Sequence, residues 1–173
     1  MAKSTTWTRL WTWINSAISI QSIRAVSVSR AINCMNAIDT NVLIYRVDRS
    51  DPIKQAKARL LLRRLSAGEV ETVLFWQVLG EFVRHLKFWQ LQGRMTSDLV
   101  RKYVATVRFS FPLEMPTPMV LDHALDLSER HSLSHWDSMI LGACKAANVT
   151  ALYTEDLGSP TQYDGIQLIN PFV

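Results

Sequence analysis

Hydrophobic and polar positions follow two alternating patterns from Met35 to the end of the chain. Short β-branched and apolar runs predict buried strands, and apolar residues three or four positions apart predict helices. The expected strands are the first part of 36–44, then 71–75, 111–115, 150–153 and 165–169. The expected helices are the last part of 36–44, then 53–65, 77–91, 98–107, 119–131 and 135–147. This alternation predicts an α/β domain, in which a central parallel sheet of about four to five strands lies between two helical layers.

Local signals support several of these boundaries. Asp51 and Pro52 are suited to the cap and first position of a helix. Ser134 is a suitable cap for the helix that starts at His135. Asp164, directly before Gly165, is most simply a turn residue.

Composition is that of a single globular domain. The chain has 173 residues, of which 48% are hydrophobic and 20% charged. No stretch approaches the roughly 18 consecutive apolar residues of a membrane span. The two cysteines, Cys34 and Cys144, do not make a disulfide framework, so we expect a reducing, cytoplasmic environment.

The net charge of +4 is located in one part of the sequence. Residues 1–34 contain four basic residues and no acid, namely Lys3, Arg9, Arg24 and Arg30. Residues 35–173 hold the other 15 basic residues and all 15 acidic ones. The main part of the chain is therefore not a general basic nucleic-acid binder, and binding of a polyanion would need a local patch or a metal ion.

Residues 1–34 are interpreted as an extension that precedes a domain at 35–173. The extension is rich in Ser, Thr, Trp and Ile. Three interpretations stay open: translated upstream sequence with the native start at Met35, an organelle transit peptide, or a helix on a membrane surface.

Four acidic residues occupy comparable places in the predicted fold. Asp39 and Asp156 each follow a strand, and Glu81 and Asp137 each lie near the start of a helix. The carboxyl ends of parallel strands share one edge of a sheet with the helix starts, so the four side chains should converge there. Clustered carboxylates repel one another unless a cation compensates, and oxygen ligands favour Mg²⁺ or Mn²⁺. Such a site is suited to phosphodiester hydrolysis.

Each acid also has a simpler interpretation. Asp39 could cap a helix, Glu81 could be a solvated helix residue, and Asp137 could interact with its helix dipole. Asp156 could belong to a turn, and Glu155 competes with it for the same role. The metal-site hypothesis therefore depends on the four acids together.

The four segments that carry these acids resemble the PIN domain. They are Ala-Ile-Asp39-Thr-Asn-Val-Leu-Ile, Gln77-Val-Leu-Gly-Glu81-Phe, His135-Trp-Asp137-Ser-Met-Ile and Tyr-Thr154-Glu-Asp156-Leu. The resemblance is closest to the toxin ribonucleases of VapBC toxin–antitoxin pairs, and it runs from about Met35 to Val173. It implies that the four acids form the metal site, supported by Asn41 and Thr154. Gly80 departs from the family pattern, in which a larger polar residue is frequent there.

The resemblance implies a Mg²⁺- or Mn²⁺-dependent endoribonuclease of a type II toxin–antitoxin system. Such proteins cut RNA, are often homodimers, and are neutralised by a small antitoxin protein. Either Asp137 or Glu81 would orient the attacking water. Residues 1–34 have no counterpart in the family.

Two rival functions stay open. An aspartyl-phosphate phosphatase also places an Asp after its first strand, but it needs a second acid two residues later, where this chain has Asn41. A non-catalytic binding module with a degenerate site is the other rival. The four retained acids count against that second possibility.

Other polar and aromatic residues receive simpler interpretations. His131 and His135 are separated by a break, so a shared zinc site is not expected, and His85 is expected to be solvated or packed. Trp136 is interpreted as a core residue that orients Asp137. The aromatic residues Trp76, Phe88 and Trp89 are also expected to pack, although an exposed face would favour base stacking.

Basic residues form two groups. The helix at 53–65 carries a group that is expected to be chiefly a solvated face, with RNA or antitoxin binding as a second possibility: Lys54, Lys57, Arg59, Arg63 and Arg64. The other group flanks the acidic segments and is the first expected place for phosphate contacts: Arg46, Arg49, Arg84 and Lys87.

Overall fold

Six strands form one sheet in the computed structural model, which describes residues 34–68, 70–157 and 161–173. The strands are β1 (Asn36–Ile38), β2 (Thr72–Phe75), β3 (Leu113–Glu114), β4 (Ala151–Tyr153), β5 (Gln162–Tyr163) and β6 (Ile166–Ile169). Their order is β3-β2-β1-β4-β6-β5, and only β5 runs antiparallel to its neighbour. The predicted parallel sheet is confirmed, and the edge strand β5 was not predicted. The interpretations of the N-terminal extension concern, apart from Cys34, residues outside the described ranges.

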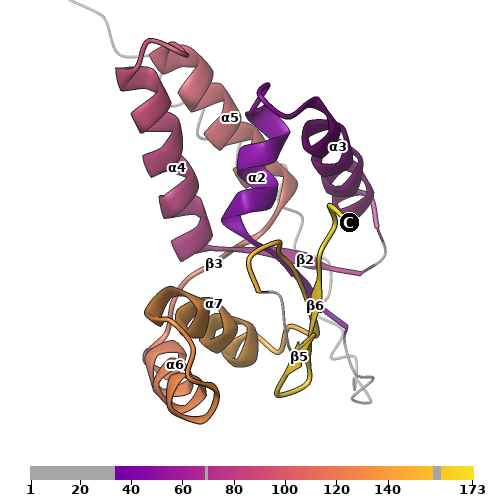
Figure 1. Cartoon of the computed structure of the whole chain (residues 1–173), viewed down its shortest axis with the longest axis vertical. Helices are drawn as coiled ribbons and strands as arrows, with labels where there is room; N and C mark the ends of the chain where they lie inside the picture. Colours follow the sequence, from indigo (N-terminus) through magenta and orange to yellow (C-terminus); the bar gives the residue numbers. More distant parts are fainter. Residues whose placement is uncertain (1–33, 69, 158–160) are drawn as a thin grey trace, which may run out of the picture. The chain divides into compact units, whose positions relative to one another are not determined.

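Helices cover both faces of the sheet. They are α2 (Thr40–Val47), α3 (Pro52–Ser66), α4 (Trp76–Leu91), α5 (Ser97–Ser110), α6 (Pro118–His131) and α7 (His135–Ala146). Figure 1 shows α2 to α5 on one side of the sheet and α6 and α7 on the other. The predicted three-layer α/β/α architecture is therefore confirmed. No helix within the described ranges is both long and apolar enough to cross a membrane.

The core is made by the central strands and the helix faces that cover them. Ala37 and Ile38 of β1, Leu74 of β2 and Leu152 of β4 are completely buried. Parallel strands with helices on both faces are apolar at successive positions, and the burial of β1 and β2 follows that rule. This continuous core fixes where each strand ends.

Polar caps start several of the helices where the sequence predicts. The Asp51 carboxylate accepts a 2.9 Å hydrogen bond from the Lys54 backbone N–H, with Pro52 in the first turn of α3. The Ser134 hydroxyl accepts a 3.3 Å hydrogen bond from the Asp137 N–H at the start of α7. These bonds satisfy N–H groups that have no partner inside the helix.

A close contact between α6 and α7 depends on a glycine. A Cβ atom added to Gly142 would lie 2.6 Å from the carbonyl oxygen of Val120 and 2.9 Å from the backbone nitrogen of Ala124. Both atoms belong to α6, so only glycine allows the two backbones to approach this closely. The pair α6 and α7 is therefore packed as a tight unit beside the sheet.

A short hairpin ties the edge of the sheet to this unit. Asp164 and Gly165 form the two-residue loop between β5 and β6, with φ values of 46° and 88°. Positive φ at both positions is typical of the turns that join antiparallel strands. The Asp164 carboxylate binds Arg130 of α6 at 2.7 Å and Lys145 of α7 at 2.7 Å. The predicted turn at Asp164 is confirmed, and its side chain links three elements.

Candidate active site

The end of β1 delivers Asp39 to the carboxyl edge of the sheet. Its backbone N–H donates to the Tyr153 carbonyl of the neighbouring strand β4 at 2.9 Å. The side chain caps α2 by accepting from the Thr40 N–H, so the alternative of a helix cap is correct for this residue. The second carboxylate oxygen accepts from the Thr154 hydroxyl at 2.6 Å and from the Asn41 amide at 3.0 Å. One carboxylate therefore both caps a helix and faces the neighbouring strand end.

Asp39 has an unusual proton affinity. The pKa of its carboxyl is raised to about 6, chiefly by burial. The hydrogen bonds from Thr154 and Thr40 lower the pKa, but burial outweighs them. The negative charges of Asp156 and Glu81 raise the pKa further, so both carboxylates act on Asp39 through space. Asp156 and Glu81 therefore both lie within electrostatic range of Asp39.

Asn41 and Thr154 connect Asp39 with Asp156. The Asn41 Nδ2 atom donates to Asp39 and, at 3.2 Å, to Asp156. The Thr154 hydroxyl donates to Asp39 and accepts a 3.2 Å bond from the Asp156 N–H. Asn41 comes from α2 and Thr154 follows β4, so the contact joins segments more than a hundred residues apart. Both predicted supporting residues therefore contact the acidic group, and their role in a metal site stays a prediction.

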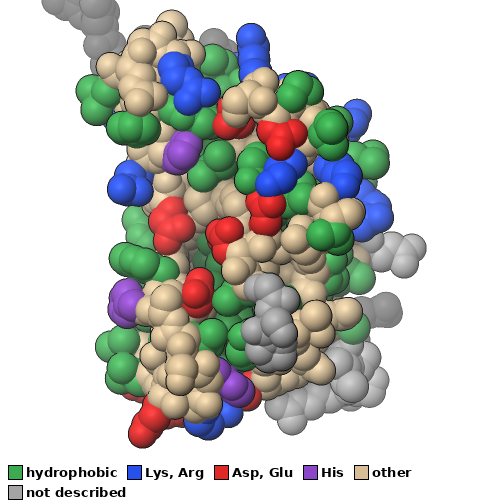
Figure 2. Space-filling view, viewed as in Figure 1, with side chains coloured by type: hydrophobic (Ala, Val, Ile, Leu, Met, Phe, Trp, Pro, Cys, Tyr) green, Lys and Arg blue, Asp and Glu red, His purple; other side chains and the backbone are tan. Residues whose placement is uncertain are grey.

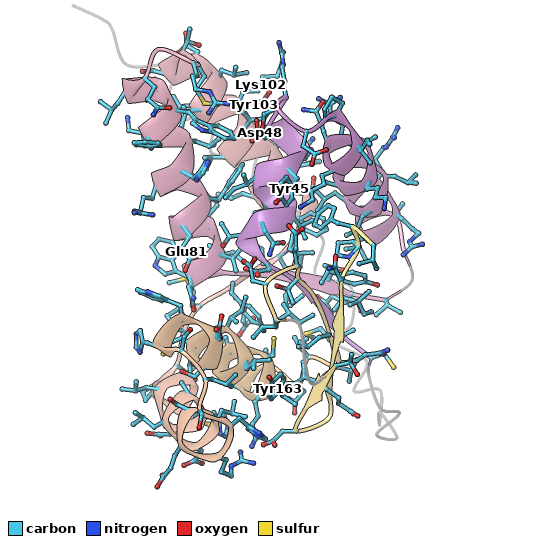
Figure 3. All side chains as sticks on the ribbon, viewed as in Figure 1. Tyr45, Asp48, Glu81, Lys102, Tyr103 and Tyr163 are labelled. Carbon is cyan, nitrogen blue, oxygen red and sulfur yellow. The ribbon has the colours of Figure 1, made fainter. Side chains whose placement is uncertain are left out.

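Glu81 is held next to this group by two residues that the sequence analysis did not assign to the site. The Thr40 hydroxyl donates to one Glu81 oxygen at 2.7 Å, and the Gln77 amide donates to the other at 3.1 Å. Gln77 lies one helical turn before Glu81, a spacing that the sequence could have revealed. Thr40 is 41 positions away, and only the fold brings it to Glu81. Figure 3 shows Glu81 on the part of α4 nearest α7.

Asp137 lies in the first turn of α7 and forms a local capping interaction. Its carboxylate accepts a 2.7 Å hydrogen bond from the Ser134 hydroxyl, which in turn accepts from the Asp137 N–H. The hydrogen-bonded chain that links Asp39, Glu81 and Asp156 does not include this carboxylate. In the described ranges, no three His, Cys, Asp or Glu side chains are gathered closely enough to hold a metal ion. The structure thus connects three of the predicted acids and leaves Asp137 apart.

Glu155 and Asp156 are adjacent in the chain but have different contacts. The Glu155 carboxylate pairs with the Lys54 ammonium group of α3, which also donates to the Tyr45 hydroxyl at 3.1 Å. Desolvation raises the pKa of Glu155, but the hydrogen bonds from Lys54 and Tyr45 help to bring the pKa below its ordinary value. Glu155 is therefore engaged in a structural ion pair. Asp156 shares the Asn41 amide with Asp39, so of the two acids it is the one hydrogen-bonded into the acidic group.

A cleft of about 940 Å³ opens beside the acidic group. Glu81 and Asp156 line it, together with Arg84 and two tryptophans, Trp76 and Trp136. Figure 2 shows acidic side chains gathered around the centre of this face of the molecule. The volume is that of a typical ligand pocket. A small polar or aromatic group can enter it next to the carboxylates.

Burial corrects three of the four predictions for aromatic residues. Trp136 was expected in the core, but 61% of its surface is exposed, so that prediction is wrong. It lies in the first turn of α7, where the buried face of the helix has not yet begun. Trp76 and Phe88 were also expected to pack, but both are exposed, so those predictions are wrong as well, whereas Trp89 is buried as expected.

The remaining candidates have ordinary roles. His131 lies 3.5 Å from Asp164, and His135 packs edge-on against Trp136, so the two histidines have separate environments. His85 packs against Trp89 and lines the cleft, and burial lowers the pKa of its ring. Of the basic residues expected near phosphate, Arg84 lines the cleft.

The chemical type of the donors near Asp39, more than their present spacing, fits a divalent cation of the Mg²⁺ class. The group offers carboxylate oxygens, with no sulfur or imidazole among them, and such donors suit hard cations. The Oδ1 atom of Asn41 is buried and has no hydrogen-bond partner. The negative charges of Asp156 and Glu81, which raise the pKa of Asp39, are also of the kind that a bound positive ion would compensate.

The chain belongs to the PIN domain family, whose profile matches residues 37–159. Members of this family are nucleases. No curated protein sequence matches the chain significantly. The family assignment confirms the resemblance that the four acidic segments indicate.

Solved structures with the same fold include toxins of toxin–antitoxin pairs. A toxin–antitoxin complex from Klebsiella pneumoniae has a TM-score of 0.56 at 16% identity, covering 79% of this chain and 97% of that one. VapBC2 from Rickettsia felis, bound to a DNA fragment from its promoter, has a TM-score of 0.56 at 13% identity, with coverages of 79% and 98%. The sarcin–ricin loop cleaving toxin VapC20 from Mycobacterium tuberculosis has a TM-score of 0.50 at 17% identity, with coverages of 70% and 89%. At these identities the likeness concerns the fold.

Proposed function

We propose that this protein is a Mg²⁺- or Mn²⁺-dependent endoribonuclease and the toxin of a type II toxin–antitoxin pair. The observation that carries the proposal is the group formed by Asp39, Glu81 and Asp156 through Asn41, Thr154 and Thr40. Membership of the PIN family and the fold shared with VapC toxins support it. Residues 35–173 form the proposed nuclease domain, and residues 1–34 a separate extension.

Each acid has a role in the proposed site. Asp39, Glu81 and Asp156 would hold the metal ion, and Asp137 would complete the set from the start of α7. When bound, the ion supplies charge stabilisation for the phosphate and lowers the pKa of a water molecule. Thr40 and Gln77 hold the Glu81 carboxylate in place. Glu81 or Asp137 orients the attacking water and receives its proton.

The proposed partners follow from the same assignment. RNA is the substrate, a small antitoxin protein is the inhibitor, and the nuclease is a homodimer located in the cytoplasm. The antitoxin proposal is supported by the toxin–antitoxin complexes among the structural neighbours. Co-purification of a small protein encoded next to this chain would test it, and a nuclease that is active and has no such partner would contradict it.

An RNA cleavage assay tests the catalytic proposal. Asp39→Asn should abolish cleavage in Mg²⁺ or Mn²⁺ while the far-ultraviolet circular dichroism spectrum stays unchanged. Asp126→Asn is a matched control, because Asp126 is an exposed carboxylate on α6. Full activity of the Asp39→Asn protein would overturn the mechanism.

A metal titration separates the nuclease from a non-catalytic binding module. The nuclease should bind Mn²⁺ saturably, and chelation of the ion should stop cleavage. Absence of saturable binding in the wild-type chain would favour the degenerate module. The phosphatase alternative is disfavoured because the amide of Asn41 occupies the place of a second acid and donates to Asp39.

A further inference from the structure

Two tryptophans are exposed to solvent in the cleft beside the acidic group. Trp76 is 51% exposed and Trp136 is 61% exposed, and both line the cleft that also contains Glu81 and Asp156. Large aromatic side chains are usually buried or take part in binding when they gather at one place on a surface. Their position beside the carboxylates links them to whatever occupies the site.

Both rings are carried by well-fixed backbone. Trp76 is the first residue of α4 and follows Phe75, which is buried at the end of β2. Trp136 is in the first turn of α7, and its ring packs edge-on against His135 with centroids 4.9 Å apart. Because both rings are already exposed, neither has to move out of the core to contact a ligand. The two helices therefore present aromatic surface to the cleft in advance of binding.

Gly80 leaves open space on the same face of α4. It lies one helical turn after Trp76 and one turn before Arg84, and all three line the cleft. A Cβ atom added at Gly80 would meet nothing within 4 Å. Along this face of α4, the ring of Trp76, the open space at Gly80 and the guanidinium group of Arg84 therefore follow one another. Glycine lowers helix stability at this position, and neither a turn nor a packing contact explains it.

We propose that Trp76, Gly80 and Trp136 form a subsite for one unpaired RNA base, with Arg84 binding the adjoining phosphate. This inference rests on the proposed nuclease function and adds to it a binding subsite made by named residues of this chain. A base within a duplex has both faces covered, whereas a base in a loop can stack on an aromatic ring. A guanidinium group is suited to phosphate. The cleft places these groups beside Glu81 and Asp156, the carboxylates proposed to act on the RNA backbone.

Binding in the presence of a chelator tests the subsite without cleavage. The probe is a six-nucleotide 2′-O-methyl oligoadenylate, compared with the same oligomer carrying abasic residues at its centre. Loss of one stacking partner weakens binding by roughly five- to 150-fold, so Trp76→Ala and Trp136→Ala should each raise Kd by such a factor. The variants with Phe should recover most of the affinity. Phe88→Ala is the matched control, because Phe88 is an exposed aromatic residue of α4 outside the cleft.

Gly80→Leu provides a test in which weaker binding cannot be attributed to loss of folding. A Cβ atom at this position meets no atom within 4 Å and leucine improves helix propensity, so the melting temperature should rise. The same side chain should fill the gap and weaken oligoadenylate binding by about the factor expected for the tryptophan variants. A more stable protein with weaker binding is the result that supports the subsite.

Several outcomes would overturn the subsite. Unchanged Kd values in both tryptophan variants, or equal wild-type affinity for the intact and the abasic oligomer, would remove the base-stacking role. If the variants bind RNA normally but fail to capture a co-expressed protein partner, the cleft is a protein-docking surface instead. These readouts need no catalysis, so they remain distinct from the Asp39→Asn cleavage test. Full cleavage by that variant would overturn the nuclease mechanism and not the binding result.

Discussion

The hydroxyl of Thr40 donates a 2.7 Å hydrogen bond to Glu81 and so connects the start of α2 with α4. Thr40 is almost completely buried, and its own N–H binds Asp39. One residue therefore touches two of the three connected acids. The geometry of the acidic group depends on a hydroxyl that cannot itself be a charged ligand.

Thr40→Val should lower both cleavage and stability. The change keeps the shape but leaves one Glu81 oxygen without its donor, at a cost of about 1–3 kcal/mol in unfolding free energy. We expect kcat to fall about tenfold or more, because a loosely held catalytic group loses its orientation. Thr40→Ser, which retains the hydroxyl, should recover most of the activity. Equal kcat values for the Val variant and the wild type would contradict this role.

Metal removal should lower the thermal stability of the wild-type protein and not that of the Asp39→Asn variant. Binding of an ion to the folded state alone stabilises it, by about 2.7 kcal/mol at a hundredfold excess over Kd. Thermal unfolding of the wild type should therefore shift upward with Mn²⁺ and return with a chelator. The variant should show little shift. An equal shift in both proteins would place the ion elsewhere.

Stability should depend on pH through Asp164. Its pKa is held well below the usual range, first by the hydrogen bond from Arg130 and then by Lys145. A lowered folded pKa gives stability that is present above the unfolded value of about 3.9 and is lost as the pH falls through the folded value. Asp164→Asn should lower the unfolding free energy at pH 7 by about 1 kcal/mol, since the partners are partly exposed.

The Asn side chain is the right replacement at position 164, because it tolerates the positive φ of this turn. Urea unfolding at pH 7 and near pH 3 measures the effect. The difference between the two proteins should shrink at the lower pH. A difference that stays constant with pH would show that the ion pairs do not cause it.

Two glycine-to-alanine changes should have opposite effects on stability. Gly142→Ala places a methyl group against the α6 backbone and should destabilise the protein by several kcal/mol, at least as much as other overpacked sites. Gly80→Ala meets no atom and should stabilise it by about 1 kcal/mol. Chemical denaturation of both variants provides the comparison. A tolerated Gly142→Ala would contradict the close approach of α6 and α7.

The two cysteines should differ in reactivity. Cys144 is completely buried, and burial raises the pKa of its thiol. Cys34 is exposed. In the native protein, a thiol reagent should modify Cys34 rapidly and Cys144 only as fast as the protein unfolds. Rapid modification of both in the absence of denaturant would show that the core opens around α7.

Patterns that repeat along the chain predict most of the fold. The helices from α3 to α7 and the strands β1, β2, β3, β4 and β6 lie close to their expected positions. The edge strand β5 has two residues and no alternating pattern long enough to recognise. Its position is decided by the turn at Asp164 and Gly165 and by pairing with β6.

The acidic group is predicted by position, but its supporting contacts are not. Asp39 and Asp156 follow strands, so the topology of a parallel sheet places them together. The contact of Thr40 with Glu81 needs the actual packing of α2 on α4. For Trp136 the prediction itself is wrong. Burial is the default expectation for tryptophan, but this residue lies in the first turn of α7 and is exposed.

The ion pair between Glu155 and Lys54 has a consequence for the approach of a polyanion. The ammonium group neutralises one of two adjacent negative charges after β4. Of these two adjacent acids, Asp156 is therefore the one whose charge is left to face a strand of phosphates arriving at the cleft. Long-range repulsion is weaker than the Glu155–Asp156 sequence suggests, which favours faster association with a negatively charged chain.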